Sequence, residues 1–189
     1  MNPSATVEGS DRHRLFCALT LPDPVLDRLV EWQRATLAGH ERVVPRANLH
    51  VTIAFLGSRP AADVLVVAGE LRAAAGSAAP IRLAAGGYRE TRSVGMVVLD
   101  DHGGHAGRLA VEVFERLERA GVYEPERRRW LPHVTVLRFR RPPKLRPSLP
   151  DLGEFSPSGA AVYHSLLRPG GAQYEILESF ALNRPNLGG

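Results

Sequence analysis

Cysteine, lysine and long apolar segments are nearly absent from this chain of 189 residues. It has one cysteine, Cys17, and one lysine, Lys144, beside 23 arginines. A single cysteine excludes a disulfide framework and a cysteine-based metal site. No apolar run approaches the ~18 residues that a membrane-spanning helix needs, and the run 15–21 is too short for the core of a signal peptide. We therefore expect a cytoplasmic protein.

Aromatic residues are also scarce, at 6% of the chain. A non-catalytic RNA-binding surface usually spaces aromatic side chains for base stacking, so this content disfavours such a module. Positive charge is in excess, with a net charge of +4 and a pI near 9.8. That excess favours an anionic partner, because the forked side chain of arginine matches phosphate oxygens.

Hydrophobic periodicity and turn residues predict seven strands and three helices. The strands are expected at 14–21, 48–56, 81–85, 94–99, 132–139, 160–167 and 174–182, and the helices at 24–37, 61–75 and 104–120. Gly76 is expected to end the second helix, and residues 87–92 are expected to connect two strands. The order predicts an α+β fold in which two similar lobes, each with an antiparallel sheet, face a central cleft with the helices outside.

The two ends of the chain differ in composition from the rest. Residues 1–13 are small and polar, and we expect them to be disordered, with a tail at 183–189. Residues 14–182 are expected to form a single bilobal domain, crossed by a link at 140–150 that is rich in proline and arginine. We expect a monomer.

One tetrapeptide occurs twice, as His50-Val-Thr-Ile and as His133-Val-Thr-Val. Random placement of seven histidines and six threonines predicts roughly 0.2 His-x-Thr pairs, so chance is a poor explanation. Side chains alternate between the two faces of a strand, so each motif presents an imidazole and a hydroxyl on one face and buries its apolar residues on the other.

Two such pairs have the groups that phosphodiester cleavage needs. One histidine can act as a base and the other as an acid near neutral pH, and each hydroxyl can donate to an oxygen that gains charge. A metal site is the competing interpretation, but no Asp, Glu or Cys recurs beside either motif and threonine is a poor zinc ligand. A serine hydrolase is disfavoured because the chain has no Gly-x-Ser-x-Gly sequence.

These motifs resemble the paired signatures of the 2H phosphoesterases, and specifically of the RNA 2′,3′-cyclic phosphodiesterases, which are also described as bacterial 2′-5′ RNA ligases. The resemblance includes the run RLFCALTLP at 14–22, the block NLHVTIAFLG at 48–57 and the block PHVTVLR at 132–138. It extends in order over most of 14–182, and it implies the 2H phosphoesterase fold.

The resemblance also implies roles for the motif residues. His50 would give a proton to the leaving oxygen, His133 would activate water, and Thr52 and Thr135 would hold the nonbridging oxygens of the phosphate. The implied reaction hydrolyses the 2′,3′-cyclic phosphate end of RNA to a 2′-phosphate and needs neither a metal nor another cofactor. Ligation to a 2′-5′ bond, which uses the same chemistry in the other direction, is left open.

Four further residues are candidates for substrate binding. Arg138 matches an arginine that follows the second motif in the family, although regular alternation puts it on the face opposite to His133. Tyr174 lies in a segment where a basic residue often precedes the tyrosine, whereas this chain has Gln173. Tyr88 and Arg92 lie on the expected connection at 87–92.

Two alternative functions remain open on the sequence alone. One is a non-catalytic RNA-binding module that uses the same basic cleft. The other keeps the fold and the chemistry but acts on a small cyclic nucleotide such as ADP-ribose 1″,2″-cyclic phosphate. The partner in either case is RNA or a nucleotide.

Overall fold

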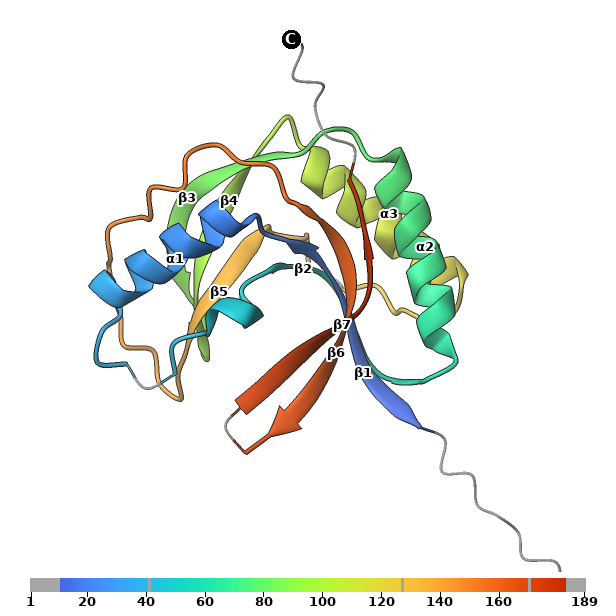
Figure 1. The fold of residues 1–189 in the computed structure, drawn as a ribbon, viewed down its shortest axis with the longest axis horizontal. Coiled ribbons are helices and arrows are strands. Elements are labelled where there is room, and N and C mark those ends of the chain that lie inside the picture. The colour runs from blue at the N-terminus through green and yellow to red at the C-terminus, as the bar shows by residue number, and fades with distance from the viewer. Residues whose placement is uncertain (1–10, 41, 127, 170, 183–189) are drawn as a thin grey trace, which may run out of the picture.

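Seven antiparallel strands form one curved sheet in the order β3-β4-β5-β2-β1-β6-β7, and three helices cover it (Figure 1). The computed structural model describes residues 11–40, 42–126, 128–169 and 171–182. The strands are β1 (Arg12–Thr20), β2 (Val51–Pro60), β3 (Arg82–Glu90), β4 (Val94–His102), β5 (His133–Arg138), β6 (Gly159–Arg168) and β7 (Gly171–Phe180). The predicted α+β class with antiparallel strands is confirmed.

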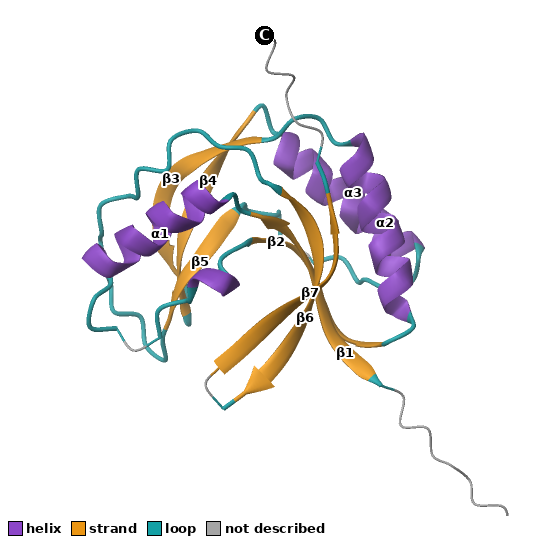
Figure 2. Cartoon of the chain, viewed as in Figure 1, coloured by secondary structure: helices purple, strands orange, loops and turns teal. Residues whose placement is uncertain are grey.

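The helices are α1 (Asp23–Thr36), α2 (Asp63–Ser77) and α3 (His105–Arg119), with a short 3₁₀ helix, η1 (Arg46–Asn48), before β2. In Figure 1, α1 lies beside the half of the sheet that contains β3, β4 and β5, whereas α2 and α3 lie together beside the other half. None of the helices in the described residues is long and apolar enough to span a membrane. A loop without regular structure leads from β5 to β6 and includes the predicted link at 140–150 (teal in Figure 2).

Strand β1 shows how the two faces of the sheet differ. Leu15, Cys17 and Leu19 belong to the large apolar core that the sheet shares with the helices. Phe16 and Ala18 point the opposite way, into a small second cluster with Ala161 and Tyr163 of β6. The alternation of one strand therefore gives the sheet a helix-covered face and an aromatic face.

The two halves of the sheet meet at a narrow seam between β2 and β5. The only residue pair of the two strands in the described ladder is Val51 with Val134. The indole nitrogen of Trp130 donates a hydrogen bond to the backbone oxygen of Thr52 at 2.9 Å, which adds a second connection. The expected two lobes, each with its own sheet, are therefore two halves of one sheet that a short seam joins.

Some expected boundaries are wrong. Strand β3 continues through Tyr88 to Glu90, so the expected connection at 87–92 is mostly strand. Its ladder with β4 has an irregularity at Gly86, where a side chain would collide with the carboxylate of Asp100. Helix α2 runs through Gly76, which does not have the positive φ of a glycine that ends a helix. The chain outside the described residues includes 1–10 of the predicted disordered segment and the whole predicted tail, and β1 begins at Arg12.

The reactivity of the Cys17 thiol is a measure of whether this core is intact. The residue is fully buried, and burial raises the pKa of the thiol to about 12, so almost no reactive thiolate exists at neutral pH. We predict that a thiol reagent such as dithionitrobenzoate does not react with the folded protein and reacts with one thiol per chain in denaturant. Rapid reaction of the native protein would contradict the placement of β1 inside the sheet, between β2 and β6.

Candidate functional site

The seam brings the two His-x-Thr motifs together with approximate twofold symmetry. Val51 lies opposite Val134 in an antiparallel pair. Continuing that register by one residue on each side places Thr52 opposite His133 and His50 opposite Thr135. The valines are fully buried, whereas the histidines and threonines are partly exposed, as the alternation predicts. Four groups that can exchange or donate protons therefore converge on one face of the sheet.

Both imidazoles are held in the same way. The Nδ1 atom of His50 lies 2.8 Å from the backbone oxygen of Asn48, and Nδ1 of His133 lies 2.8 Å from the backbone oxygen of Leu131. A carbonyl oxygen only accepts, so Nδ1 carries the hydrogen in each ring. The Nε2 atom of each neutral imidazole is then left as the proton acceptor.

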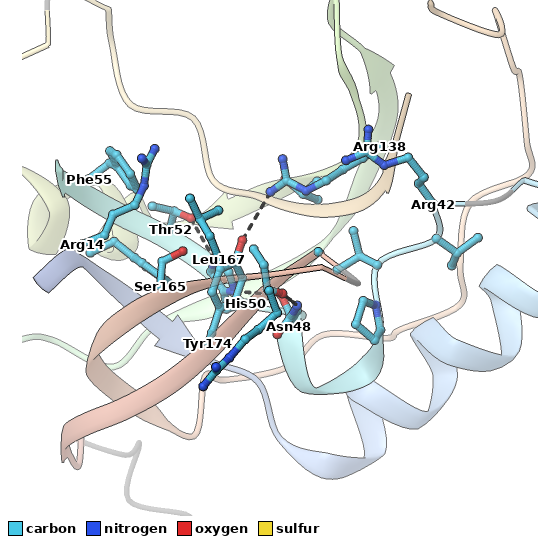
Figure 3. Close-up of a pocket in the computed structure, with 18 residues that line it drawn as sticks. Arg14, Arg42, Asn48, His50, Thr52, Phe55, Arg138, Ser165, Leu167 and Tyr174 are labelled. Atoms are coloured by element: carbon cyan, nitrogen blue, oxygen red, sulfur yellow. Dashed lines mark hydrogen bonds between the residues drawn. The ribbon is translucent and has the colours of Figure 1, made fainter. Parts of the chain in front are cut away.

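Thr52 is the immediate partner of His50. Its Oγ1 lies 3.1 Å from Nε2 of His50 (dashed line in Figure 3). Because Nδ1 already carries the hydrogen, the threonine hydroxyl is the donor in this bond. If His50 takes up a proton at Nε2, that nitrogen can no longer accept a hydrogen bond from Thr52. The threonine hydroxyl can then donate to another acceptor.

Aromatic side chains surround His50. Its ring centre lies 4.9 Å from that of Phe16, 5.6 Å from that of Tyr163 and 5.3 Å from that of Tyr174. Phe16 and Tyr163 stack on each other at 4.8 Å, with their planes 2° apart. These rings come from β1, β6 and β7, so the aromatic face of one half of the sheet forms a wall behind the first histidine.

This environment favours the neutral form of His50. Burial is the main cause that lowers its pKa, to about 4, and the positive charge of Arg138 lowers it further. The hydrogen bond to the oxygen of Asn48 acts in the opposite direction but is the smaller effect. In the free protein, His50 is therefore uncharged at pH 7.

A cleft of about 620 Å³ opens in front of His50. It is lined by Arg14, Phe16, Arg42, Val43, Val44, Pro45, Asn48, His50, Thr52, Phe55, Thr135, Arg138, Ser165, Leu167, Arg168, Gly171, Ala172 and Tyr174. Four of these residues are arginines and none is acidic. None of the four arginines forms an ion pair with a carboxylate in the part of the chain that the structure describes. The cleft is therefore suited to an anion.

A β-bulge explains how Arg138 reaches this cleft. On β4, Gly95 and Met96 are neighbours, but their partners on β5 are Leu137 and Thr135, so Val136 is an extra residue. Val136 and Leu137 are both buried, and the alternation is reversed after them. Arg138 then lies on the same face as Thr135, and its Nη2 donates to the hydroxyl of Tyr174 at 3.4 Å (Figure 3).

Helix α1 holds the bulge in place through one buried amide. Gln33 is only 4% exposed, and its Nε2 donates to the backbone oxygens of Val44 at 3.0 Å and Val136 at 2.9 Å. The amide of Val44 donates to the same oxygen of Val136, and the amide of Arg138 donates to the oxygen of Arg42. Segment 42–44 and the bulge are thus joined through Gln33.

The other predicted binding residues divide into two groups. Tyr174 lines the cleft, where it contacts both His50 and Arg138. Tyr88 does not line it: its hydroxyl donates to Glu90, and its ring lies 6.4 Å from that of Trp32 on α1. Arg92 is exposed in the turn between β3 and β4 and does not line the cleft either.

No group of three or more His, Cys, Asp or Glu side chains that could hold a metal ion occurs within residues 11–40, 42–126, 128–169 and 171–182. The donors gathered at the seam are two imidazoles and two hydroxyls. Such a set is suited to proton transfer and to hydrogen bonding with an oxyanion.

The family of this fold follows from sequence comparison. Residues 21–166 match the 2′-5′ RNA ligase superfamily. The chain belongs to this superfamily. A relative from Thermus thermophilus, named RNA 2′,3′-cyclic phosphodiesterase, is 32% identical over 89% of this chain and 90% of its own. One from Methanocaldococcus jannaschii with the same name is 23% identical over 88% of this chain and 99% of its own.

Solved structures agree on the fold of the superfamily. The crystal structure of TT0787 of Thermus thermophilus superposes with a TM-score of 0.75 at 29% identity, over 90% of this chain and 98% of that one. The structure of Escherichia coli LigT complexed with 3′-AMP superposes with a TM-score of 0.77 at 21% identity, over 92% and 100%. The resemblance to the 2′-5′ RNA ligase family that the two motifs indicated is therefore confirmed.

Several residues that line the cleft of this superfamily member are absent from the sequence prediction: Arg14, Phe16, Arg42, Phe55, Ser165, Leu167 and Arg168. The alternation of β1 gave a usable signal, because Arg14 and Phe16 lie on the face opposite to the buried Leu15 and Cys17. Arg42 and Ser165 gave none, since their position depends on contacts with β5 and β1 that are distant in the sequence.

The pKa of His50 tests the arrangement of Arg138 and Gln33. We predict an NMR titration of His50 with its midpoint near pH 4 in the free protein. The variant Arg138→Met raises that pKa, because it removes a nearby positive charge. Gln33→Leu changes the pKa in the same direction, because loss of the amide releases the bulge and moves the guanidinium away.

Trp32→Phe is the matched control for Gln33→Leu. Trp32 precedes Gln33 on α1 and also donates to a distant backbone oxygen, that of Ser148 at 2.6 Å, rather than to the bulge. It should therefore destabilise the protein without changing the pKa of His50. A free-protein midpoint near 6.5 that does not respond to Arg138→Met would contradict this description of the site.

Proposed function

We propose that this chain hydrolyses 2′,3′-cyclic phosphate ends of RNA to 2′-phosphates, with His50 and His133 as the acid and the base. The observation that supports the proposal is the pairing of Val51 with Val134, which joins the two motif strands beside a basic cleft lined by His50, Thr52 and Thr135 and by no carboxylate among the described residues. The Nδ1 atom of each motif histidine is bonded to a backbone oxygen, which leaves Nε2 for proton transfer. The relatives from Thermus thermophilus and Methanocaldococcus jannaschii bear the name of this activity.

The proposed reaction is an in-line displacement at phosphorus. Nε2 of His133 takes a proton from water as the water oxygen forms a bond to phosphorus. The bond from phosphorus to O3′ breaks on the opposite side, and His50 gives O3′ a proton from Nε2. The 2′-ester bond remains intact, so the product is a 2′-phosphate. The sum is the addition of one water molecule across the P–O3′ bond.

The remaining groups hold the phosphate while it reacts. Thr52 and Thr135 lie opposite the two histidines and donate to the nonbridging oxygens. Arg138 supplies a planar pair of donors that neutralises their charge. Tyr174 orients the guanidinium of Arg138 through its hydroxyl. These interactions strengthen as charge develops on the oxygens in the transition state.

The low pKa of His50 imposes a condition on its role as the acid. The free imidazole is neutral at pH 7, so it must gain a proton before it can give one. A bound phosphate places a negative charge close to Nε2, and an opposite charge raises the pKa of a histidine. Substrate binding is therefore coupled to proton uptake at His50. Once Nε2 carries this proton, it no longer accepts the hydrogen bond from Thr52, and the threonine hydroxyl can donate to the phosphate.

Ligation follows the same geometry with a different nucleophile. If the 5′-hydroxyl of a second RNA takes the place of water, His133 removes its proton and the P–O3′ bond breaks as before. The product is then a 2′-5′ phosphodiester, and no energy source beyond the strained cyclic phosphate enters the balance. We propose that hydrolysis dominates, because water is the more concentrated nucleophile.

Replacement of either histidine tests the proposal most simply. We predict that His50→Ala and His133→Ala each lower kcat on an RNA with a 2′,3′-cyclic phosphate end by about 10² to 10⁴, the usual contribution of a positioned acid or base. The double variant should be little worse than either single one, because the two groups act in one step. Treatment with EDTA should leave the rate unchanged.

His102→Ala serves as the control for these variants. His102 pairs with Glu154 on the surface and does not line the cleft, so its loss should leave the rate unchanged. A wild-type protein without turnover on any cyclic-phosphate end, or an activity that EDTA abolishes and zinc restores, would refute the proposed function.

A further inference from the structure

One end of the cleft combines an exposed aromatic ring with an arginine. Phe55 is 42% exposed, whereas Phe16 and Tyr163 of the same aromatic face are 3% and 6% exposed. The guanidinium of Arg14 lies 5.0 Å above the ring of Phe55. Figure 3 shows Arg14 and Phe55 on one side of His50 and Arg138 and Arg42 on the other. The proposed phosphate site thus has one flank formed by Arg14 and Phe55 and a second, different flank formed by Arg138 and Arg42.

A buried serine lines the same cleft as this ring. Ser165 is only 8% exposed and lines the cleft, but its side chain forms no hydrogen bond within the described residues. Its oxygen is not fully enclosed by protein atoms, so a ligand atom in the cleft can form a hydrogen bond with it. No reaction step proposed above uses this hydroxyl.

The register of the sheet makes Arg14 and Ser165 neighbours. Leu15 of β1 lies opposite His164 of β6, so continuing the ladder by one residue brings Arg14 opposite Ser165. Both side chains are on the aromatic face, as is Phe16, which lies opposite Tyr163. The arginine, the hydroxyl and the exposed ring of Phe55 therefore belong to a single subsite.

We infer that this subsite binds the nucleobase of the nucleotide that carries the cyclic phosphate, and that guanine fits it best. The inference rests on the proposed function and specifies its substrate. A base stacks on an exposed aromatic ring through its flat face. Arg14 can only donate, so it requires a base edge with acceptors, and guanine presents O6 and N7 side by side to a forked guanidinium. The hydroxyl of Ser165 completes the contacts with the edge.

The distance between subsite and phosphate suits a single nucleotide. The ring of Phe16 contacts both sides, with its centre 4.9 Å from that of His50 and 6.5 Å from that of Phe55. In a nucleotide, one ribose separates the base from the 2′,3′-phosphate. A base on Phe55 and a phosphate at His50 are separated by a comparable length, that of the ring of Phe16. The contact of Arg14 with Phe55 is an exposed cation–π contact, which is weak enough to be exchanged for a base edge.

A second phosphate is the less suitable occupant of this subsite. The exposed surface here is apolar, because Leu167, which is 79% exposed, also lines the cleft. Arg14 and Ser165 could donate to phosphate oxygens, but Phe55 and Leu167 offer a phosphate no hydrogen bond, whereas a flat base can stack on the ring of Phe55 and bond to both donors. Arg42 and Arg138, at the other flank, are the better sites for a neighbouring phosphate.

The test compares five small substrates: the 2′,3′-cyclic phosphates of guanosine, adenosine, cytidine and uridine, and methyl riboside 2,3-cyclic phosphate, which has no base. We expect the wild-type protein to prefer guanosine. Arg14→Met and Ser165→Ala should each lower kcat/KM for guanosine by about tenfold, as expected for the loss of a specific contact with a base edge. Neither variant should change the rate on the substrate without a base. Phe55→Leu should lower kcat/KM for all four nucleosides.

Arg72→Met is the matched control for Arg14→Met. Its guanidinium also lies 5.0 Å over a phenyl ring, that of Phe180, but it does not line the cleft. It should change none of the five rates. Binding of guanosine 2′-monophosphate, measured by calorimetry, tests the subsite without turnover, and Arg14→Met should weaken it about tenfold.

The outcomes separate this inference from the proposed function. Absence of turnover on all five substrates and on an RNA with a 2′,3′-cyclic phosphate end refutes the function, and the binding measurement then decides the subsite alone. If guanosine 2′,3′-cyclic phosphate is hydrolysed and Arg14→Met and Ser165→Ala change neither its rate nor the binding of the monophosphate, the inference is wrong. An equal loss on the substrate without a base also overturns it, because Arg14 would then act on the phosphate.

Discussion

The pairing of Val51 with Val134 is the contact on which the rest of the site depends. It sets the register of the two motif strands, so each histidine faces the threonine of the other motif. Both valines are fully buried, which fixes the faces of both strands, since a slip by one residue would turn every catalytic candidate into the core. The described ladder between the two strands is only one pair long, and the cleft lies on the face that carries His50, Thr52 and Thr135.

The two motifs have the same sequence pattern, but their histidines lie in different surroundings. His50 lies against Phe16, Tyr163 and Tyr174, and burial there lowers its pKa. Both imidazoles have the same hydrogen bond from Nδ1 to a backbone oxygen, so they are held in the same way and differ only in their environment. Two chemically identical side chains can divide acid and base work when their environments differ in this way.

The sequence was sufficient for what depends on local alternation and insufficient for what depends on long-range pairing. His50, Thr52, His133 and Thr135 followed from period-2 strands, and so did the buried valines between them. The bulge at Val136 reverses the face of Arg138, and it depends on Gln33 and on the segment 42–44, which no local pattern indicates. Tyr88 was placed in a connection because the glycines before it resemble a turn, whereas pairing with β4 extends the strand past them.

The identity of the product isomer is the most direct test of the central claim that the two histidines act on opposite sides of one phosphorus atom. A 2′,3′-cyclic phosphate can open to either isomer, and solvent hydrolysis gives a mixture. With His50 beside O3′ and His133 beside the attacking water, phosphorus NMR of the products from a cyclic-ended RNA should show almost only the 2′-phosphate. A mixture of both isomers, or mainly the 3′-phosphate, would contradict this assignment of the acid and the base.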